Sequence, residues 1–296
     1  MRVVSLLPSL TEIVHALGCG DRLVGVSHEC DHPASVRRLP VLTRSRIPVE
    51  ASSVEIDAAV SSVGGGLYEI DEARLAELEP DLILTQEQCD VCAVDERVVR
   101  RVAAGLPRPC AVESVNPVDL ASVHEVFRRV GDLLGAAEAA ESLVATHERT
   151  TEEIRGRLAG SEQVRTVFLE WLEPPFIAGH WIPELIAAAG GIELLGEAGK
   201  PSRRTTWEEI TKADPHVILL APCGFSLRKA QAELTVLRAR AEWRTLRAVR
   251  TGRVALFDGS AFFSRPGPRL EASLRQAAAA LHPDRFPEVA VHWVVG

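Results

Sequence analysis

The sequence predicts an α/β protein of two lobes, which are joined by a long backbone helix and leave a ligand cleft between them. Three observations predict this fold class. Short apolar runs alternate with amphipathic stretches along most of the chain, a pattern typical of parallel α/β architecture. A proline-free stretch with helical periodicity separates two such regions. The chain has 296 residues, a length that suits two lobes at roughly 100–200 residues per domain.

This alternation divides the chain into four parts. We expect an N-terminal lobe over residues 1–115, a connecting backbone helix over 116–160, a C-terminal lobe over 161–285 and a tail over 286–296. Gly135 is a soft point at which the connecting helix can break, because glycine destabilises a helix interior.

Individual elements follow from local signals. The N-terminal lobe is expected to begin with a buried strand at residues 3–7. The Ser-Leu-Thr-Glu sequence at 9–12 is a capping box, which predicts the start of a helix. We expect this helix to end at Gly18. The other elements expected in this lobe are strands at 23–26, 81–85 and 110–112 and helices at 71–79 and 95–104. Those expected in the second lobe are strands at 164–169, 216–220 and 253–257 and helices at 183–189, 206–212, 226–239 and 268–281. Trp293 in the tail is expected to pack back onto this lobe.

The composition excludes several classes of function. The formal net charge of −8 disfavours a nucleic-acid partner, whose phosphates require a basic surface. No stretch reaches the roughly 18–20 apolar residues of a membrane-spanning helix, so we expect no membrane insertion. The glycine-rich loops that bind dinucleotides or nucleoside triphosphates are missing, which predicts that no nucleotide cofactor is used. The first residues do not resemble a signal peptide, so we expect a cytoplasmic chain as written, and a periplasmic or extracellular one only if the true start lies upstream.

Ligands of parallel sheets bind outside the carboxyl ends of the strands, so the loops that follow the strands are the candidate sites. The loop after the second expected strand consists of Ser27, His28, Glu29, Cys30 and Asp31. Imidazole and thiolate groups are ligands for zinc and similar ions, so this loop could hold a metal. The alternative is a polar loop whose side chains bond the backbone and cap a helix.

The loop after the strand at 81–85 contains Gln86 and a Cys-x-x-Cys pair, Cys89 and Cys92. Such a pair can be a redox dithiol, part of a contact to a ligand or metal, or two small packed side chains. No second pair and no thioredoxin pattern accompanies it, so all three alternatives stay open.

Aromatic residues concentrate in the second half of the chain, where all five tryptophans follow position 170. Several rings fall on loops after expected strands. Exposed rings in such a place predict a large flat apolar ligand or a protein partner, and core packing is the alternative. The residues of these loops that we single out are Trp171, Phe176, His180, Trp181, Trp207, Phe262, Phe263 and Arg265.

Several segments resemble a known family. Residues 3–12 (VVSLLPSLTE) resemble the opening of the helical-backbone, or class III, solute-binding proteins of ABC transporters, which serve iron siderophores, haem and cobalamin. The sequences at 79–83 (EPDLI) and 213–218 (ADPHVI) are similar to a Pro-Asp-strand element of that periplasmic-binding-protein-like fold, one in each lobe. The features that are similar to its cobalamin-binding branch are Pro174-Pro175-Phe176 followed by Gly179, Trp207 at a helix start, and the run Phe262-Phe263-x-Arg265.

This resemblance implies two Rossmann-like lobes with a corrinoid lying edgewise in the cleft. It implies that Trp171, Phe176, Trp207 and Phe262 or Phe263 cover apolar parts of the ligand, and that polar groups at 27–31 meet its propionamides. The other residues expected to contact the ligand are Tyr68, Gln86, Cys89, Cys92, His180, Trp181 and Arg265. His28, His180, Cys89 or Cys92 could then ligate the cobalt, because neutral imidazole and thiolate are ligands for such metals.

The expected function is non-enzymatic binding of cobalamin or a related corrinoid, linked to ABC-type uptake or to intracellular corrinoid handling. The expected partners are the small-molecule ligand and a transporter permease, and the family's docking acid falls near Ala213, close to Glu208 and Glu209. One alternative keeps the fold and exchanges the ligand for haem, a ferric chelate or a metal ion. Another is a CxxC-dependent enzyme that acts on a corrinoid or another small molecule.

Overall fold

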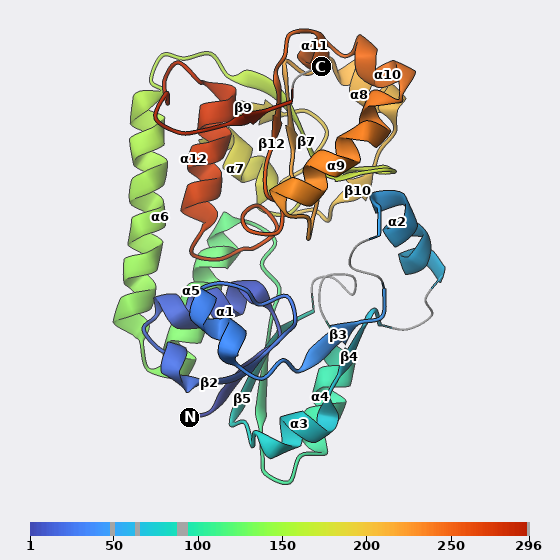
Figure 1. Ribbon diagram of the computed structural model, residues 1–296. Coiled ribbons are helices and arrows are strands. Elements are labelled where there is room, and N and C mark those ends of the chain that lie inside the picture. Colours follow the sequence, from blue (N-terminus) through green and yellow to red (C-terminus); the bar gives the residue numbers. More distant parts are fainter. Residues whose placement is uncertain (48–50, 63–65, 88–93, 295–296) are drawn as a thin grey trace. The chain divides into compact units, whose positions relative to one another are not determined.

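The computed structural model describes residues 1–47, 51–62, 66–87 and 94–294 (Figure 1). The chain forms two compact units, which are described separately below. Unit 1 comprises Met1–Ala51, Glu55–Pro117 and Ser122–Val144, and unit 2 comprises Ser52–Val54, Val118–Ala121 and Ala145–Gly296. The division at Val144 falls inside the connecting helical segment, so each unit contains part of that segment.

Unit 1 contains a parallel sheet of four strands. These are β1 (Val3–Ser5), β2 (Leu23–Val26), β5 (Leu82–Gln86) and β6 (Ala111–Val115), in the order β2-β1-β5-β6. The four strands expected from apolar runs in this part of the chain are confirmed. A separate antiparallel ribbon pairs β3 (Thr43–Ser45) with β4 (Tyr68–Ile70). This ribbon was not predicted, because its two strands are not apolar runs and are too short to show an alternation.

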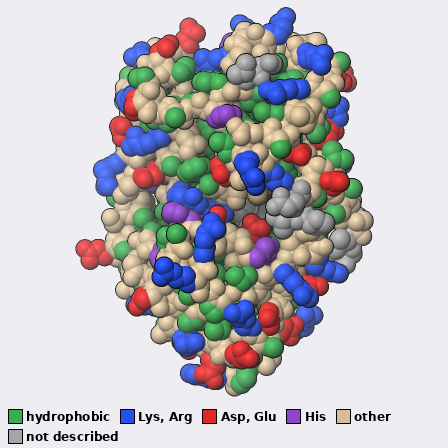
Figure 2. Space-filling view, viewed as in Figure 1, with side chains coloured by type: hydrophobic (Ala, Val, Ile, Leu, Met, Phe, Trp, Pro, Cys, Tyr) green, Lys and Arg blue, Asp and Glu red, His purple; other side chains and the backbone are tan. Residues whose placement is uncertain are grey.

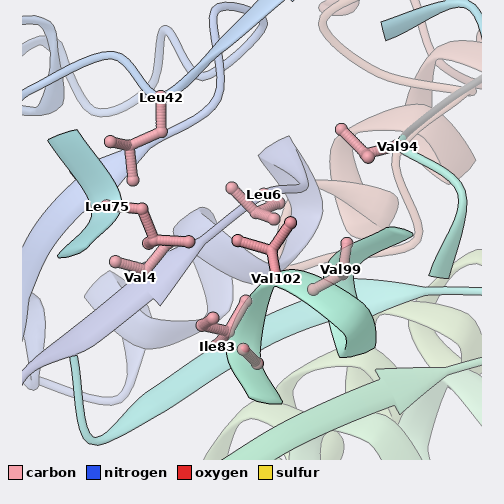
Figure 3. Close-up of a cluster of buried hydrophobic side chains, with 9 residues drawn as sticks. Val4, Leu6, Leu42, Leu75, Ile83, Val94, Val99 and Val102 are labelled. Atoms are coloured by element: carbon pink, nitrogen blue, oxygen red, sulfur yellow. The ribbon is translucent and has the colours of Figure 1, made fainter. Parts of the chain in front are cut away.

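Helices cover both faces of this sheet, with α1 and α5 on one side and α3 and α4 on the other (Figure 1). The helices that contribute to unit 1 are α1 (Pro8–Ala16), α2 (Ser53–Ser62), α3 (Glu72–Glu77), α4 (Glu96–Ala104), α5 (Leu120–Leu134) and α6 (Ala137–Arg157), with short 3₁₀ helices η1 (Gly20–Arg22) and η2 (Ala34–Arg38). Leu82, Ile83 and Leu84 of β5 are all buried, as expected for a parallel strand that is covered on both faces. Figure 3 shows the core on the α3/α4 face, which is formed by Val4, Leu6, Leu42, Leu75, Ile83, Val94, Val99 and Val102.

The predicted start of the first helix is wrong. The helix α1 begins at Pro8, and Leu7 precedes it without any side-chain cap. The backbone of proline is preorganised for the first helical position, so Pro8 begins the helix before the expected capping box. Thr11 and Glu12 of that sequence are therefore buried inside the helix. The predicted end at Gly18, which has a φ of 74°, is confirmed.

The connecting segment consists of two helices, α5 and α6, and the expected break at Gly135 is confirmed. Gly135 has a φ of 65°, a conformation that glycine adopts without steric cost. Close packing occurs one turn earlier, because a Cβ on Gly131 would lie 2.6 Å from the Cβ of Ala140. The chain therefore turns sharply at this point.

Unit 2 contains a larger mixed sheet. Its strands are β7 (Val164–Leu172), β8 (Pro175–Ile177), β9 (Gly191–Glu193), β10 (Arg203–Arg204), β11 (Val217–Leu220), β12 (Val254–Leu256) and β13 (His292–Trp293). The order is β10-β8-β7-β11-β12-β13, with β9 also paired to β7. The strands β9, β7, β11 and β12 are parallel, and β8, β10 and β13 are antiparallel to their neighbours. The predicted strands β7, β11 and β12 are confirmed, as is the expectation that Trp293 packs back.

The helices of unit 2 besides the end of α6 are α7 (Ile182–Ala188), α8 (Trp207–Ala213), α9 (Leu227–Arg238), α10 (Ala241–Thr245), α11 (Arg247–Arg250) and α12 (Leu270–Leu281). Thr206 and Ser226 cap α8 and α9 by accepting backbone N–H groups. Among the described residues, none of the helices is both long enough and apolar enough to cross a membrane. Figure 2 shows basic side chains interspersed with acidic ones on the described part of the face in view.

Candidate functional site

The carboxyl ends of β7, β11 and β12 lie side by side in unit 2, as their parallel pairing requires. We name this region the unit 2 edge, and it comprises residues 170–172, 221–227 and 257–265. Its loops are bound to one another, since the N–H of Cys223 donates to the carbonyl of Glu170 at 2.9 Å. A Cβ on Gly259 would lie only 2.1 Å from the carbonyl oxygen of Pro222, so these two loops are in direct backbone contact. The unit 2 edge is therefore held together by backbone contacts.

Aromatic rings with accessible surface lie on and beside this edge. Trp171 is half-buried and packs edge-on against Phe225, with ring centroids 5.1 Å apart. Phe176 pairs directly across the sheet with Trp171 and is also half-buried. Phe262, the third half-buried ring, follows β12. The sequence-predicted residues Trp171, Phe176 and Phe262 thus keep surface that a ligand can contact.

Cationic side chains lie over three rings of this region. The ammonium group of Lys229 lies 3.9 Å from the centroid of Phe225, a buried ring that packs edge-on against Trp171. The guanidinium of Arg204 lies 5.5 Å from the ring of Phe176, and that of Arg269 lies 5.5 Å from the ring of Phe262. These cation–π contacts hold the rings in place and put hydrogen-bond donors next to apolar surface.

Other predicted aromatic residues belong to the core. Phe263 is 2% exposed and packs against Phe168 and Phe257, with ring centroids 5.2 and 4.9 Å away. Trp207 is 6% exposed and packs edge-on against Trp243. Of the two adjacent phenylalanines after β12, Phe262 is therefore the one that presents a surface.

His180 and Trp181 lie away from these loops. The ring of His180 is 5.9 Å from that of Trp181, and its backbone N–H donates to the carbonyl of Lys200 at 2.7 Å. Trp181 is 6% exposed at the start of α7. Burial lowers the pKa of His180, which has a φ of 52°. Both residues follow β8, whose antiparallel pairing with β7 carries the chain away from the unit 2 edge.

Polar groups fix the loop after β12. The two carboxylate oxygens of Asp258 accept the backbone N–H groups of Ala261 at 2.7 Å and Leu227 at 3.2 Å. Arg265 is 5% exposed and donates to the hydroxyl of Ser260 at 3.3 Å. The charges of this loop therefore organise the loop itself and the start of α9.

In unit 1, a chain of buried hydroxyl and thiol groups holds the ends of β1 and β2. Thr11 donates from its hydroxyl to the hydroxyl of Ser5 at 2.8 Å, and its oxygen lies 3.1 Å from the Sγ of Cys30. The same sulfur lies 3.3 Å from the hydroxyl of Ser27. Cys30 is thus engaged on two sides, and the polar-loop alternative describes Ser27 and Cys30 well.

His28 lies in the loop after β2 and is half-buried. Its Nδ1 lies 2.7 Å from the hydroxyl oxygen of Thr43, and its ring is 5.3 Å from that of Tyr68. Its Nε2 is buried without a hydrogen-bond partner and lies 3.4 Å from a carboxylate oxygen of Glu29. Burial lowers the pKa of His28, and the nearby charge of Glu29 opposes this effect. The imidazole is therefore anchored to Thr43 through Nδ1.

The remaining predicted residues of unit 1 have different surroundings. Gln86 is buried at the end of β5, and Asp31 lies 3.9 Å from the guanidinium of Arg37. Cys89 and Cys92 lie outside the described residues, so their role stays a prediction. The described part of the chain contains no group of three or more histidine, cysteine or carboxylate side chains that could hold a metal ion.

The acids near Ala213 differ in their environment. Glu209 accepts from the hydroxyl of Thr205 at 2.6 Å and from the guanidinium of Arg203 at 3.1 Å. These hydrogen bonds lower the pKa of Glu209 to about 2. Glu208 is exposed and is the more accessible of the two.

Sequence reasoning did not find Phe225, Asp258 as a loop anchor, or Thr43. Phe225 and Asp258 both follow a predicted strand, so the rule that directed attention to strand-end loops could have found them. Thr43 lies on the β3–β4 ribbon, and its proximity to His28 depends on tertiary packing that no local pattern signals.

Comparison with known proteins defines the class of this chain. Residues 3–261 match the periplasmic binding protein family, so the chain belongs to this family of binding proteins. It is 24% identical over 296 residues to an uncharacterized ABC transporter substrate-binding lipoprotein of Bacillus subtilis, covering 97% of this chain and 82% of that protein. A vitamin B12-binding protein of Yersinia pestis is 26% identical over 223 residues, which cover 74% of this chain and 69% of that one.

A solved structure supports the same fold. The crystal structure of a periplasmic heme binding protein from Pseudomonas aeruginosa matches with a TM-score of 0.74 and 20% identity, over 100% of this chain and 99% of that one. The expected α/β fold class and family are thereby confirmed. The name of the Bacillus subtilis relative describes a lipoprotein, which fits the periplasmic or extracellular alternative and gives no support to the cytoplasmic expectation.

Proposed function

We propose that this protein binds cobalamin or a related corrinoid and releases it unchanged. The observation that carries the proposal is the aromatic surface beside the unit 2 edge, formed by Trp171, Phe176 and Phe262. A corrinoid is a large amphipathic disc, so its binding requires ring contacts together with scattered hydrogen bonds. The three half-buried rings provide the ring contacts.

Polar contacts to the corrinoid side chains come from basic residues of unit 2 in this proposal. Arg204, Lys229 and Arg269 put donors next to the rings, where they can meet amide oxygens or the phosphate of a nucleotide loop. A vitamin B12-binding relative supports this choice of ligand.

The same proposal extends to transport. A substrate-binding lipoprotein among the relatives supports delivery of the ligand to an ABC transporter permease outside the cytoplasm. Glu208 is the exposed acid on α8 and is the candidate for contact with that permease, whereas Glu209 is engaged by Arg203 and Thr205.

Haem is the second candidate ligand. The observation that favours it is the unpartnered Nε2 of His28, because an imidazole is an axial ligand of haem iron. A heme-binding protein among the structural neighbours supports this alternative as well. Haem is also a flat macrocycle, so the aromatic surface suits it equally.

A competition titration followed by visible absorbance tests the choice of ligand. Purified protein is titrated with cyanocobalamin in the presence and absence of hemin, and the variant Trp171→Ala is titrated in parallel. We expect saturable binding of cyanocobalamin, and we expect Trp171→Ala to weaken it at least about tenfold, because loss of a central aromatic contact costs more than about 1.4 kcal/mol.

Trp293→Ala is the matched control, since Trp293 is also half-buried but lies in β13 at the end of the sheet order. This variant should bind cyanocobalamin like the wild type. Binding of hemin alone would exclude the corrinoid, and equal losses in both variants would exclude a specific role for the aromatic surface.

A further inference from the structure

Unit 2 contains a cavity that is separate from the unit 2 edge. Its volume is about 580 Å³, which lies within the range of roughly 300–1,000 Å³ typical of small-molecule sites. The cavity is lined by the start of α5, the end of α6, α7, the residues before β7 and β9, and the residue after α12. All of these lining residues belong to unit 2. Because the parallel strands β7 and β9 begin here, the cavity lies toward amino ends of strands, whereas the unit 2 edge lies at carboxyl ends.

Contacts between side chains and backbone hold the walls of this cavity in place. A carboxylate oxygen of Glu184, on α7, accepts the backbone N–H of Leu120 at 2.7 Å and so joins α7 to the start of α5. The Nε2 of His282 lies 3.1 Å from the carbonyl oxygen of Gly190, next to β9. A Cβ on Gly190 would lie 2.5 Å from the same Nε2 and 2.8 Å from the Cδ1 of Leu158, so this wall is closely packed. The cavity is therefore fixed by contacts between elements that are distant in the sequence.

The charges around the cavity favour a cationic ligand. Its lining contains the carboxylates of Glu162 and Glu184 and the guanidinium of Arg155. Arg155 forms an ion pair with Glu152 on the surface of α6, which offsets its charge. The carboxyl end of the 21-residue helix α6 also lies here, and the carboxyl end of a helix carries a partial negative charge. Burial lowers the pKa of His282, which works against a further positive charge at the cavity wall.

Hydrogen-bonding capacity and apolar surface narrow the class of ligand further. A carboxylate can accept up to about four hydrogen bonds, so Glu184 retains acceptor capacity beyond its bond to Leu120. A primary ammonium group has three donors that suit such an acceptor. The lining also includes the half-buried apolar side chains of Leu120, Leu158 and Ala188. A small organic cation with an ammonium group and a hydrocarbon chain matches both kinds of surface.

We propose that this cavity is a second ligand site, which binds a small alkylammonium ion. Glu184 and Glu162 receive the ammonium group through charge-assisted hydrogen bonds. Leu120, Leu158 and Ala188 cover the hydrocarbon chain. The site is independent of the proposed corrinoid binding, because none of these residues belongs to the unit 2 edge.

Titration with hexylamine hydrochloride, followed by the backbone amide NMR signals of the protein, tests this proposal. The amide of Leu120 is the reporter, because its N–H is bound to Glu184 at the cavity wall. We expect this signal to shift saturably as hexylammonium is added. Hexanoate has a chain of the same length and the opposite charge, and it should bind at least about tenfold more weakly, because it cannot donate charge-assisted hydrogen bonds to carboxylates.

Glu184→Gln separates the charge of this residue from its structural role. The amide oxygen of glutamine can still accept the N–H of Leu120, so the wall should stay in place while the negative charge is lost. We expect this variant to weaken hexylammonium binding at least about tenfold. Glu148→Gln is the matched control, because it removes the same charge from an exposed residue of α6 that does not line the cavity, and it should bind like the wild type.

Ala188→Leu tests the place of the hydrocarbon chain. Ala188 is the last residue of α7, where leucine is also a good helix former, so the helix should be kept while the larger side chain fills part of the cavity. We expect the affinity for hexylammonium to fall at least about tenfold, with an unchanged circular dichroism spectrum. If this variant does not fold, the comparison of Glu184→Gln with Glu148→Gln decides alone.

Four results would overturn the proposal. Equal losses in Glu184→Gln and Glu148→Gln would mean that net charge alone attracts the ligand. Equal or tighter binding of hexanoate would exclude a cation as the ligand class. A loss in Trp171→Ala that is absent in Glu184→Gln would place the cation on the aromatic surface instead. An unshifted Leu120 signal at hexylammonium concentrations up to about 50 mM, where ligands of this size can bind, would exclude the site and leave the proposed function intact.

Discussion

The loops at the strand ends of the two units are held by different kinds of interaction. In unit 1, hydroxyl, thiol and imidazole groups of Ser5, Thr11, Ser27, Cys30 and His28 hold the loops through hydrogen bonds. In unit 2, packed rings and direct backbone contact hold the loops. Directional hydrogen bonds therefore hold the strand-end loops of unit 1, whereas apolar packing and backbone contact hold those of unit 2. The following predictions test this comparison.

The largest effect is expected for Phe263→Ala. Phe263 is 2% exposed and packs against Phe168 and Phe257, so its truncation should lower the free energy of unfolding by about 3–5 kcal/mol. Phe262→Ala is the control, because Phe262 is half-buried and should lose stability to a far smaller extent. Urea denaturation of both variants measures this. Equal losses would mean that the two rings do not divide into a core and a surface residue.

Backbone contact in unit 2 is tested by Gly259→Ala. The added Cβ would lie 2.1 Å from the carbonyl oxygen of Pro222, so the two loops must separate, at a cost of about 1–3 kcal/mol. Gly156→Ala is the control, because no atom lies within 4 Å of the added Cβ and Gly156 lies inside α6, where alanine is favoured over glycine. Thermal unfolding should show the larger decrease for Gly259→Ala, and the reverse order would contradict the contact.

The hydrogen-bonded network of unit 1 is tested by Thr11→Val. This change keeps the shape of the side chain but removes its bonds to Ser5 and Cys30, and it should lower the free energy of unfolding by about 1 kcal/mol. Thr11→Ser keeps the hydroxyl and should recover most of this loss. Denaturant unfolding at pH 7 measures both. An unchanged Thr11→Val protein would show that packing rather than hydrogen bonding holds this edge.

The smallest effect is expected from the ion pair of Glu209. Arg203 and Thr205 lower the pKa of Glu209 from its ordinary value of 4.5 to about 2. A depressed carboxyl pKa adds stability that is fully present above the unfolded value and is lost as the pH falls toward the folded one. The melting temperature should therefore fall more steeply between pH 4.5 and 2 for the wild type than for Glu209→Gln. Parallel slopes would contradict this.

The sequence indicated most of the parallel strands because burial on both faces makes them continuous apolar runs, as in β5 and β11. It did not indicate the parallel strand β9 or the antiparallel strands β8, β10 and β13, since these short segments have neither a continuous apolar run nor a measurable alternation. The first helix was expected two residues late because the capping pattern was given more weight than Pro8 at the first helical position.

The site was predictable in outline and not in detail. Strand-end loops and their aromatic content pointed to Trp171, Phe176 and Phe262, but neighbours in sequence such as Phe262 and Phe263 cannot be told apart without knowing which one faces the core. The pairing of His28 with Thr43 joins residues 15 positions apart through a ribbon that has no sequence signature. Contacts of that kind arise only from tertiary packing.

Calorimetric titration of the folded wild-type protein with cyanocobalamin is the most direct test of the central claim. The account predicts a saturable heat of binding with one ligand per chain and a Kd below roughly 100 μM, equivalent to more than about 5 kcal/mol of binding free energy. Absence of binding at that concentration, in protein whose fold is verified by circular dichroism, would contradict the claim.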